Sequence, residues 1–318
     1  MTARIVYLGA PEGFAALEEA IAGRAELDYV EAEPMAVAEA LFDASALLDA
    51  SMQVHIDDGM IAAAPDLQVI SCATTGSDHI DRGECLRRSI PVHTLREDRE
   101  LLQNITPAAE LSWALVLAAA RRLPAALAHT RAGGWRREDF PGLMLHGKRL
   151  GLIGCGRIGG WMARYGQAFG MTVVGYDPFV EAWPESIRPA GLNELFESCD
   201  VISVHVHLSD ETRGLISAEL LATIKPGAIL INTSRGAIVD EAALLVALQS
   251  GRMGAAGLDV LEGEPEVAGH PLMAYAREHD NLLITPHCGG FSPDAVRLVC
   301  RRAAEKIVAD LRLGGLED

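Results

Sequence analysis

Short apolar segments alternate with longer amphipathic segments along almost the whole chain. The short segments are rich in Val, Ile and Leu and are bounded by turn residues, which is typical of buried strands. The longer segments carry the spacing of helices. This alternation predicts the α/β class, with doubly wound parallel sheets. The expected strands are 4–8, 45–49, 67–72, 91–93, 150–153, 172–176, 200–205, 228–232, 255–260 and 282–285.

A strong helix start follows the charged run at 96–100. Thr106 is a suitable N-cap, and Pro107 suits the first helical position because the missing N–H costs nothing there. We expect the helix to run to about Arg122 and to be stopped by Pro124. Another helix is expected to close the chain, over residues 293–313.

At 318 residues the chain exceeds the size at which one hydrophobic core usually keeps growing, so we expect two domains. We place the crossing between them near 99–105 and the return crossing near 288–292. One domain then consists of residues 1–99 and 291–318, and the other, residues 100–290, is inserted into it.

Composition narrows the class of partner. Hydrophobic residues make up 49% and charged residues 22%, which is ordinary for a folded protein and excludes a disordered chain. The formal net charge of −17 argues against nucleic acid or an anionic membrane, because both select basic surfaces. An anionic substrate must therefore be attracted by a few local cations or helix termini.

The cysteines and the hydropathy indicate the cytoplasm. No signal peptide is evident at the N-terminus, and the most apolar stretch, 107–120, is too short to span a bilayer and contains Glu110. The cysteines show neither CxxC pairing nor a metal-like spacing, so we expect reduced thiols. They are Cys72, Cys85, Cys155, Cys199, Cys288 and Cys300.

A glycine fingerprint follows the expected strand 150–153. Gly154 permits a tight turn, Gly156 lets a diphosphate approach the backbone, and Gly159 allows a helix to pack closely on the strand. The N–H groups at the start of that helix, near Ile158, are suited to binding the diphosphate. Alone this motif is weak evidence for a dinucleotide site, because a glycine-rich turn between a strand and a helix can have the same pattern without binding a ligand.

An acid at the expected distance strengthens the fingerprint. Asp177 lies eighteen residues after Gly159, at the end of the next expected strand. A carboxylate there binds a ribose 2′-hydroxyl and repels a 2′-phosphate. Pro178 follows, and no arginine occurs before Arg188. The sequence therefore predicts a dinucleotide site that prefers NAD to NADP.

Three side chains come just after expected strands: Arg235, Glu264 and His287. Because ligands lie beyond the carboxyl ends of parallel strands, all three should share one edge with Gly154. A guanidinium binds a carboxylate with two hydrogen bonds. An imidazole can give or take a proton near neutral pH, and a carboxylate beside it orients the ring. These types suit the reduction of a 2-keto acid.

Each of these residues also has a structural alternative. Arg235 and Glu264 can be surface residues in turns, and a lone histidine is more often structural than catalytic. The spacing of His205 and His207 on one strand suggests a metal pair, but no third ligand is evident, so we expect cofactor-lining residues and no metal. Cys288 is interpreted as a small packing residue, because hydride transfer needs no nucleophile.

Taken together, these segments resemble the D-2-hydroxyacid dehydrogenase family almost from end to end. The resemblance implies a Rossmann cofactor domain inserted into a flavodoxin-like substrate domain, normally in a homodimer. The segments that carry it are TTGSDHID (74–81), TPAAEL (106–111), GLIGCGRIG (151–159), Asp177, TSRGAIVDEAAL (233–244), GLDVLEGEP (257–265) and TPHCGG (285–290).

The resemblance also implies roles for particular residues. His287 would be the proton donor and acceptor, Glu264 would orient it, and Arg235 would bind the substrate carboxylate. Asp259 would contact the nicotinamide amide. The residues expected to bind substrate are Ser51, Met52, Thr75, Gly76 and Arg235. Those expected to bind NAD are Thr106, Gly154, Gly156, Arg157, Ile158, Gly159, Asp177, His205, His207, Thr233, Asp259 and Gly290.

Some positions depart from the family pattern. Thr74 stands where the family often has Gly, and His207 where it has Pro. Ser51 and Met52 supply no cation, which disfavours phosphoglycerate. The leading hypothesis is therefore a reductase of glyoxylate, hydroxypyruvate or a similar acid. The alternatives are a dehydrogenase of a larger, sugar-derived or phosphorylated acid, with the long charged loop 95–105 lining the site, and an NAD-sensing protein without turnover.

Overall fold

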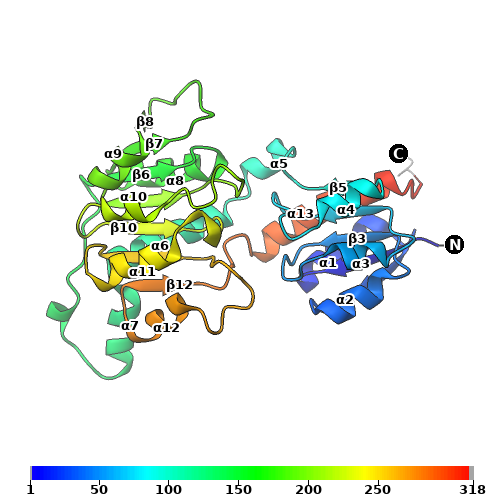
Figure 1. Ribbon diagram of the computed structural model, residues 1–318, viewed down its shortest axis with the longest axis horizontal. Helices are drawn as coiled ribbons and strands as arrows, with labels where there is room; N and C mark the ends of the chain where they lie inside the picture. The colour runs from blue at the N-terminus through cyan, green and yellow to red at the C-terminus, as the bar shows by residue number, and fades with distance from the viewer. Residues whose placement is uncertain (1, 315–318) are drawn as a thin grey trace. The chain divides into compact units, whose positions relative to one another are not determined.

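The contacts within the chain divide it into two units (Figure 1). A computed structural model describes residues 2–314, so the predicted ends of the first domain, Met1 and 315–318, lie outside the described residues. One unit contains the described residues up to Ile105 and from Phe291 onward, and Thr106–Gly290 form the other. The second unit is inserted into the first, and the crossing into it, between Ile105 and Thr106, lies at the far end of the predicted stretch 99–105.

A partly buried charge network ties residues 94–98 to the first unit. The carboxylate of Asp98 receives hydrogen bonds from Arg302 Nε, at 2.5 Å, and from Lys306 Nζ. Lys306 Nζ also donates to the carbonyl of Thr94 at 2.6 Å. The chain at 94–98 is thus attached to the final helix of the first unit.

The first unit is a five-stranded parallel sheet in the order β2-β1-β3-β4-β5, which is the flavodoxin-like order. Helices α1 and α13 cover one face, and α2, α3 and α4 cover the other. The strands are β1 Arg4–Leu8, β2 Glu26–Tyr29, β3 Ala46–Asp49, β4 Val69–Cys72 and β5 Val92–His93. The helices are α1 Pro11–Ile21, α2 Pro34–Leu41, α3 Asp58–Ala62, α4 Arg82–Arg87, α5 Arg99–Gln103 and α13 Pro293–Asp310.

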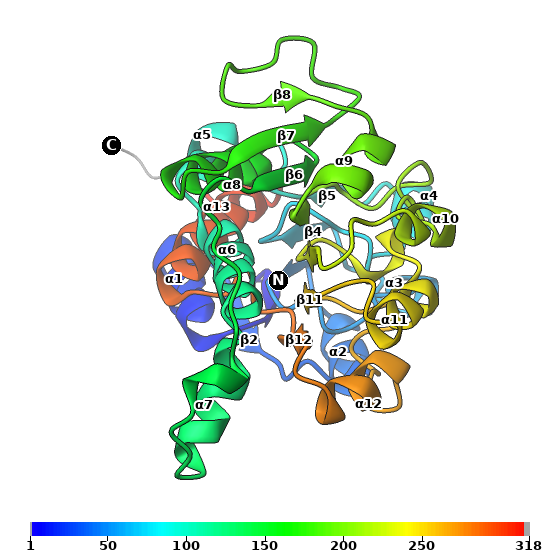
Figure 2. The ribbon, with the colours of Figure 1, turned by 90° about the vertical axis from the view of Figure 1, so that its left-hand side faces the viewer.

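The second unit is a seven-stranded parallel sheet in the order β12-β11-β10-β9-β6-β7-β8, a Rossmann order extended by β12. Helices α6 and α8 cover one face (Figure 2). The strands are β6 Arg149–Ile153, β7 Thr172–Tyr176, β8 Arg188–Pro189, β9 Val201–Val204, β10 Ile229–Asn232, β11 Ala255–Leu258 and β12 Leu282–Ile284. The helices are α6 Pro107–Ala120, α7 Leu123–Arg131, α8 Arg157–Ala168, α9 Leu192–Ser198, α10 Ala218–Ala222, α11 Glu241–Gln249 and α12 Pro271–Glu278, with 3₁₀ turns η1 Arg137–Asp139 and η2 Gly236–Ile238.

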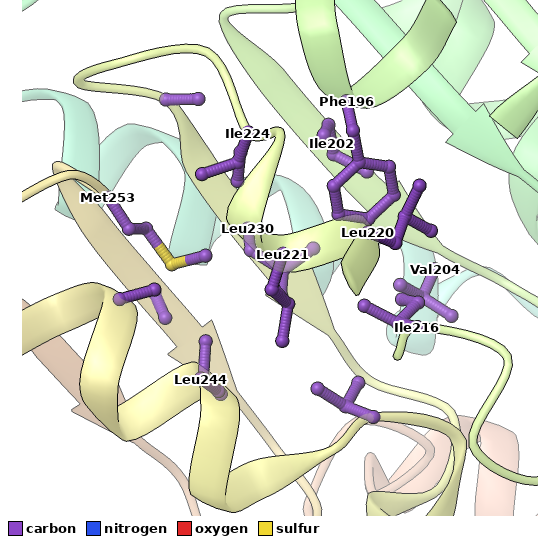
Figure 3. Packing of buried hydrophobic residues seen from close by; sticks show 14 of the residues in the cluster. Phe196, Ile202, Val204, Ile216, Leu220, Leu221, Ile224, Leu230, Leu244 and Met253 are labelled. Carbon is purple, nitrogen blue, oxygen red and sulfur yellow. The ribbon is translucent and has the colours of Figure 1, made fainter. Parts of the chain in front are cut away.

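The other face of this sheet carries the largest hydrophobic cluster, from α9, α10, α11 and α12 (Figure 3). Phe196, Leu221 and Leu244 pack there over Leu230 of β10 (Figure 3). β9, β10 and β11 are buried on both faces, so their sequences are mostly apolar and show no alternation of apolar and polar positions. This core fixes the strand ends from which the site is built.

Helix starts are set by short polar side chains. Each of five N-cap side chains accepts a hydrogen bond from the backbone N–H three residues later, which satisfies an otherwise unpaired donor. These N-caps are Asp57, Asp81, Ser217, Asp240 and Ser292.

The structure corrects four local predictions. Pro107 does begin α6, but the Thr106 side chain does not cap it, because its hydroxyl donates to Glu110 at 2.6 Å. α6 ends at Ala120, before the predicted end near Arg122, and Pro124 lies instead in the first turn of α7, a helix that the sequence did not predict. The edge strands β2 and β8 were missed because their residues are largely exposed and give no buried apolar run.

Among the described residues, no single helix has the length and apolar character to cross a membrane, although one bent pair, Arg99–Ala120 with Leu123–Arg131, meets those criteria by length and composition alone.

Candidate functional site

The glycine fingerprint forms the turn between β6 and α8. Gly154 has φ +89°, and a Cβ there would lie 2.4 Å from the carbonyl oxygen of His205. A Cβ on Gly159 would lie 2.1 Å from the carbonyl oxygen of Gly154. A Cβ on Gly156 would have no neighbour within 4 Å, so the backbone is open where a diphosphate would approach. Tight turn and close packing are therefore real constraints on Gly154 and Gly159.

Asp177 closes this turn from the end of β7. One carboxylate oxygen accepts the N–H of Cys155 at 2.9 Å, and the other accepts the N–H of Phe179 at 3.0 Å. A carboxylate oxygen can accept more than one hydrogen bond, so Asp177 can still bind ribose hydroxyls. The donors and acceptors at this end of the sheet fit a dinucleotide, with Arg157 and Ile158 in the first turn of α8.

Arg235 lies in a loop that is organised by the last residue of β10. Asn232 is buried, its Nδ2 donates to the carbonyl of Arg235 at 2.9 Å, and its Oδ1 accepts the N–H of Ser234 at 3.0 Å. Arg235 Nη1 donates to the carbonyl of Ser234 at 2.8 Å. A Cβ on Gly236 would lie 2.1 Å from the backbone nitrogen of Glu262, so this loop packs directly on the turn that carries Glu264.

Thr233 in the same loop is tied to α6. Its hydroxyl oxygen lies 2.7 Å from that of Ser112, which is fully buried. Ser112 uses its one proton toward the carbonyl of Ala108 at 2.6 Å, so Thr233 donates to Ser112.

His287 and Glu264 meet as predicted. His287 Nδ1 lies 2.8 Å from Glu264 Oε1, and about a third of each side chain is exposed. His287 has φ +51°, a left-handed conformation that is uncommon for a residue with a Cβ. This backbone is held by bonds from its N–H to the carbonyls of Asp259 and Thr285. The strain is a mark of functional sites.

Asp259 organises the turn that presents His287. The residue is buried, and its carboxylate accepts hydrogen bonds from the hydroxyl of Thr285, from Cys288 N at 3.0 Å and from Gly289 N at 2.7 Å. A Cβ on Gly289 would lie 2.8 Å from that carboxylate. Burial and the charge of Asp259 raise the pKa of Cys288, so its thiol is a poor nucleophile.

His205 lies beside the glycine turn as a neutral ring. Burial lowers its pKa to about 3, Nε2 lies 2.8 Å from the hydroxyl of Ser203, and Nδ1 is buried with no hydrogen-bond partner among the described residues. His207 is exposed, and its carbonyl accepts the hydroxyl of Thr212. No group of three or more His, Cys, Asp or Glu within residues 2–314 is arranged to hold a metal ion.

In the first unit, the predicted substrate residues lie on two adjacent loops. Ser51 and Met52 follow β3, and Thr75 and Gly76 follow β4. The loops are joined by a hydrogen bond from Ile56 N to the carbonyl of His79, at 2.9 Å.

Four contributors were not expected from the sequence. Asn232 and Ser112 bind the loop of Arg235 and Thr233, and Asp49 and His79 bind the first unit's loops to each other. Asn232 and Asp49 each gave a signal, since each is a polar residue at the end of an apolar strand. The others act across long sequence separations, which no local pattern records.

Comparison with known families agrees with this geometry. Residues 5–98 match the D-isomer specific 2-hydroxyacid dehydrogenase catalytic domain, and residues 113–289 match the NAD-binding domain of the same family. D-3-phosphoglycerate dehydrogenase of Mycobacterium tuberculosis is 40% identical over 256 residues, which is 80% of this chain and 46% of that protein. The chain thus spans about half the length of the curated relatives it matches.

Solved structures are similar over their whole length. A protein of Thermus thermophilus superposes with a TM-score of 0.85 and 34% identity, covering 97% of both chains. D-Lactate dehydrogenase of Aquifex aeolicus, solved with NAD and lactic acid, gives a TM-score of 0.81 and 26% identity, again over 97% of both chains.

Proposed function

Because the chain belongs to the D-isomer specific 2-hydroxyacid dehydrogenase family, we propose that it transfers a hydride between NAD(H) and C2 of a small 2-hydroxy or 2-keto acid. The second unit is an NAD-binding domain. The observation that carries the proposal is the contact between His287 and Glu264, at 2.8 Å, on the same edge of the sheet as the glycine turn and Arg235.

In the proposed reaction, bound NADH supplies the hydride that reduces the keto carbon. His287 gives a proton to the carbonyl oxygen. Its Nδ1 faces Glu264, so Nε2 is the nitrogen that meets the substrate. The carboxylate of Glu264 orients the ring and faces the positive charge that the ring carries when it holds the proton to be transferred. Arg235 binds the substrate carboxylate, which places C2 for the transfer.

The cofactor is proposed to bind along the same edge. The N–H groups of the turn at Gly154–Gly159 and of the start of α8 would hold its diphosphate. Asp177 accepts the ribose hydroxyls, and its charge excludes the 2′-phosphate of NADP. His205 and His207 line the adenosine end. The residues proposed to bind the nicotinamide end of the cofactor are Thr106, Thr233, Asp259 and Gly290.

The first unit is proposed to bind the substrate. The backbone N–H groups of Thr75 and Gly76 bind its carboxylate, and Ser51 and Met52 limit its size. Small acids such as glyoxylate or hydroxypyruvate fit a loop that presents Met52 rather than a cation.

A phosphorylated 2-hydroxy acid is the second candidate, because the relatives at 37–40% identity are named D-3-phosphoglycerate dehydrogenases. One cation lies near the loop after β4: Arg82 Nη1 donates to the hydroxyl of Ser77 at 2.8 Å. The sequence did not single out this arginine. Replacement of Arg82 by Gln separates the candidates, since it weakens turnover of a phosphorylated acid and leaves glyoxylate unaffected.

NADH consumption across a panel of 2-keto acids tests the proposal. The panel contains glyoxylate, hydroxypyruvate, pyruvate, bulky keto acids and phosphohydroxypyruvate. We expect saturable turnover with at least one acid and preference for NADH over NADPH. Absence of turnover with every acid, at NADH concentrations that saturate the protein, contradicts the proposal and favours an NAD-sensing protein.

We also propose a homodimer in the cytoplasm. The segment from α7 to Met144 exposes apolar side chains, with Trp135 93% and Met144 70% exposed, and α7 extends beyond the sheet (Figure 2). Apolar groups gathered in this way are typical of an interface. In sedimentation experiments we expect the wild type to be a dimer and Trp135→Ser to dissociate at a higher concentration. A monomeric wild type contradicts the proposed dimer.

The six free cysteines fit a reducing compartment such as the cytoplasm.

A further inference from the structure

A buried histidine and a buried aspartate lie beneath the two loops of the first unit. Asp49, the last residue of β3, is fully buried, and His79 is 9% exposed. His79 Nε2 lies 2.7 Å from Asp49 Oδ2. Nothing in the hydride-transfer chemistry uses either residue, yet burying a charge is costly unless it is paired and hydrogen-bonded. The pair therefore requires a structural or functional reason.

The Asp49 carboxylate shapes the first loop. Its Oδ1 accepts Ser51 N at 2.7 Å, Ser51 Oγ at 2.9 Å and Met52 N at 3.2 Å. Met52 is held with φ +56°, a conformation that residues other than glycine adopt rarely. The three donors and His79 together satisfy the carboxylate, and the turn at Ser51 and Met52 depends on it.

His79 links Asp49, and with it the turn at Ser51 and Met52, to the loop that follows β4. It stands three residues after Gly76, in the segment that follows β4. Its carbonyl accepts Ile56 N at 2.9 Å, and Asp81 N donates to the carbonyl of Ile56 at 2.9 Å. The two loops are thus joined by backbone hydrogen bonds at Ile56 and by the side-chain contact between Asp49 and His79.

We propose that Asp49 and His79 are positioning residues for substrate binding: the pair holds the loop with Ser51 and Met52 in register with the loop of Thr75 and Gly76. This role rests on the proposed function, because it presumes that these loops bind the 2-keto acid. The pair acts through the loop backbone and touches no reacting atom. A group that binds ground state and transition state alike changes KM rather than kcat.

Variants of His79 test this role. His79→Leu removes the donor to a buried carboxylate, so we expect KM for the keto acid to rise about 10- to 100-fold while kcat changes less than about threefold. The dissociation constant of NADH should not change, because the cofactor binds to the second unit. His79→Gln keeps an N–H at the reach of Nε2 and should restore KM to within about threefold, whereas the shorter His79→Asn should not.

A second histidine–aspartate contact in the same unit provides the matched control. His93 Nε2 also lies 2.7 Å from an aspartate, Asp310, but this contact joins β5 to the end of α13. His93→Leu should leave KM for the keto acid unchanged. If His79→Leu does not fold, the comparison of His79→Gln with His79→Asn decides the question.

The outcomes separate this proposal from the proposed function. A raised KM in His79→Leu or His79→Asn, with rescue by His79→Gln, supports the positioning role. An unchanged KM in His79→Asn, or a loss of kcat and NADH affinity in place of a KM effect, overturns it. A wild type that consumes no NADH with any acid of the panel refutes the proposed function instead.

Discussion

Replacement of Glu264 by Gln isolates the charge that faces His287. The two side chains are nearly isosteric, so the contact at 2.8 Å to His287 Nδ1 can persist while the carboxylate charge is lost. At this distance two unit charges interact by about 1.5 kcal/mol in water and about 6 kcal/mol at an effective dielectric constant of 20. About a third of each side chain is exposed, so solvent screening favours the lower value.

The interaction between the Glu264 carboxylate and the His287 imidazolium affects the rate most in the direction of hydroxy acid oxidation. There the imidazole takes up a proton as the alcohol is oxidised, so the positive charge on His287 develops in the transition state. A loss of about 1.5 kcal/mol then lowers kcat for 2-hydroxy acid oxidation about tenfold in Glu264→Gln. Glu264→Ala also removes the hydrogen bond and should lose about 30-fold or more.

The assay is NADH formation at saturating NAD, with the hydroxy acid that corresponds to the best keto acid of the panel. Glu262→Gln is the matched control, because Glu262 lies on the same turn and its side chain pairs with the exposed Arg213, at 3.7 Å. An oxidation rate for Glu264→Gln within about twofold of wild type would show that the Glu264 charge does not stabilise the transition state. An equal loss in Glu262→Gln would contradict that role as well.

Three further predictions concern the cofactor site and the first unit. Gly159→Ala should lose NADH affinity and stability, because the added Cβ would lie 2.1 Å from a backbone oxygen that cannot easily move. In the control Gly160→Ala the added Cβ has no neighbour within 4 Å, so this variant should be as stable as wild type or slightly more stable. Calorimetry and NADH titration measure the two effects. Asp177→Ala should raise the ratio of kcat/KM for NADPH to that for NADH at least about tenfold, and an unchanged ratio would contradict the role of this carboxylate. Burial alone raises the pKa of Asp98, but hydrogen bonds from Lys306 and Arg302 outweigh it and hold the pKa below its usual value. The ionised form therefore stabilises the fold above about pH 4, and that stabilisation is lost as the pH falls through the native pKa. Asp98→Asn should accordingly be less stable than wild type at pH 7, with a gap that narrows below about pH 4 in urea unfolding, and a gap that does not vary with pH would contradict the assignment.

The sequence predicted the sheets well because most strands are buried on both faces. Runs such as Val201–Val204 and Ile229–Asn232 have no exposed position, so their apolar character marks them directly. The edge strand Glu26–Tyr29 has no such mark, since its position in the sheet leaves its side chains half exposed. Pro124 was expected to stop a helix, yet a proline is equally acceptable in the first turn of the next one.

The candidate site was predictable where chemistry follows a strand end. Arg235, Glu264 and His287 come a few residues after three parallel strands, and parallel strands bring their carboxyl ends to one edge. The pair Asp49–His79 spans 30 residues, and the contact of Ser112 with Thr233 spans 121. Such contacts depend on how loops and helices pack, which spacing along the chain does not encode.

His287, oriented by Glu264, is proposed to move the proton while NADH supplies the hydride. The direct test is the rate of NADH-dependent reduction by His287→Gln, measured at saturating NADH with the best acid of the panel. We expect a loss of about 100- to 10,000-fold with unchanged NADH affinity. Turnover of that variant within about twofold of wild type would contradict it.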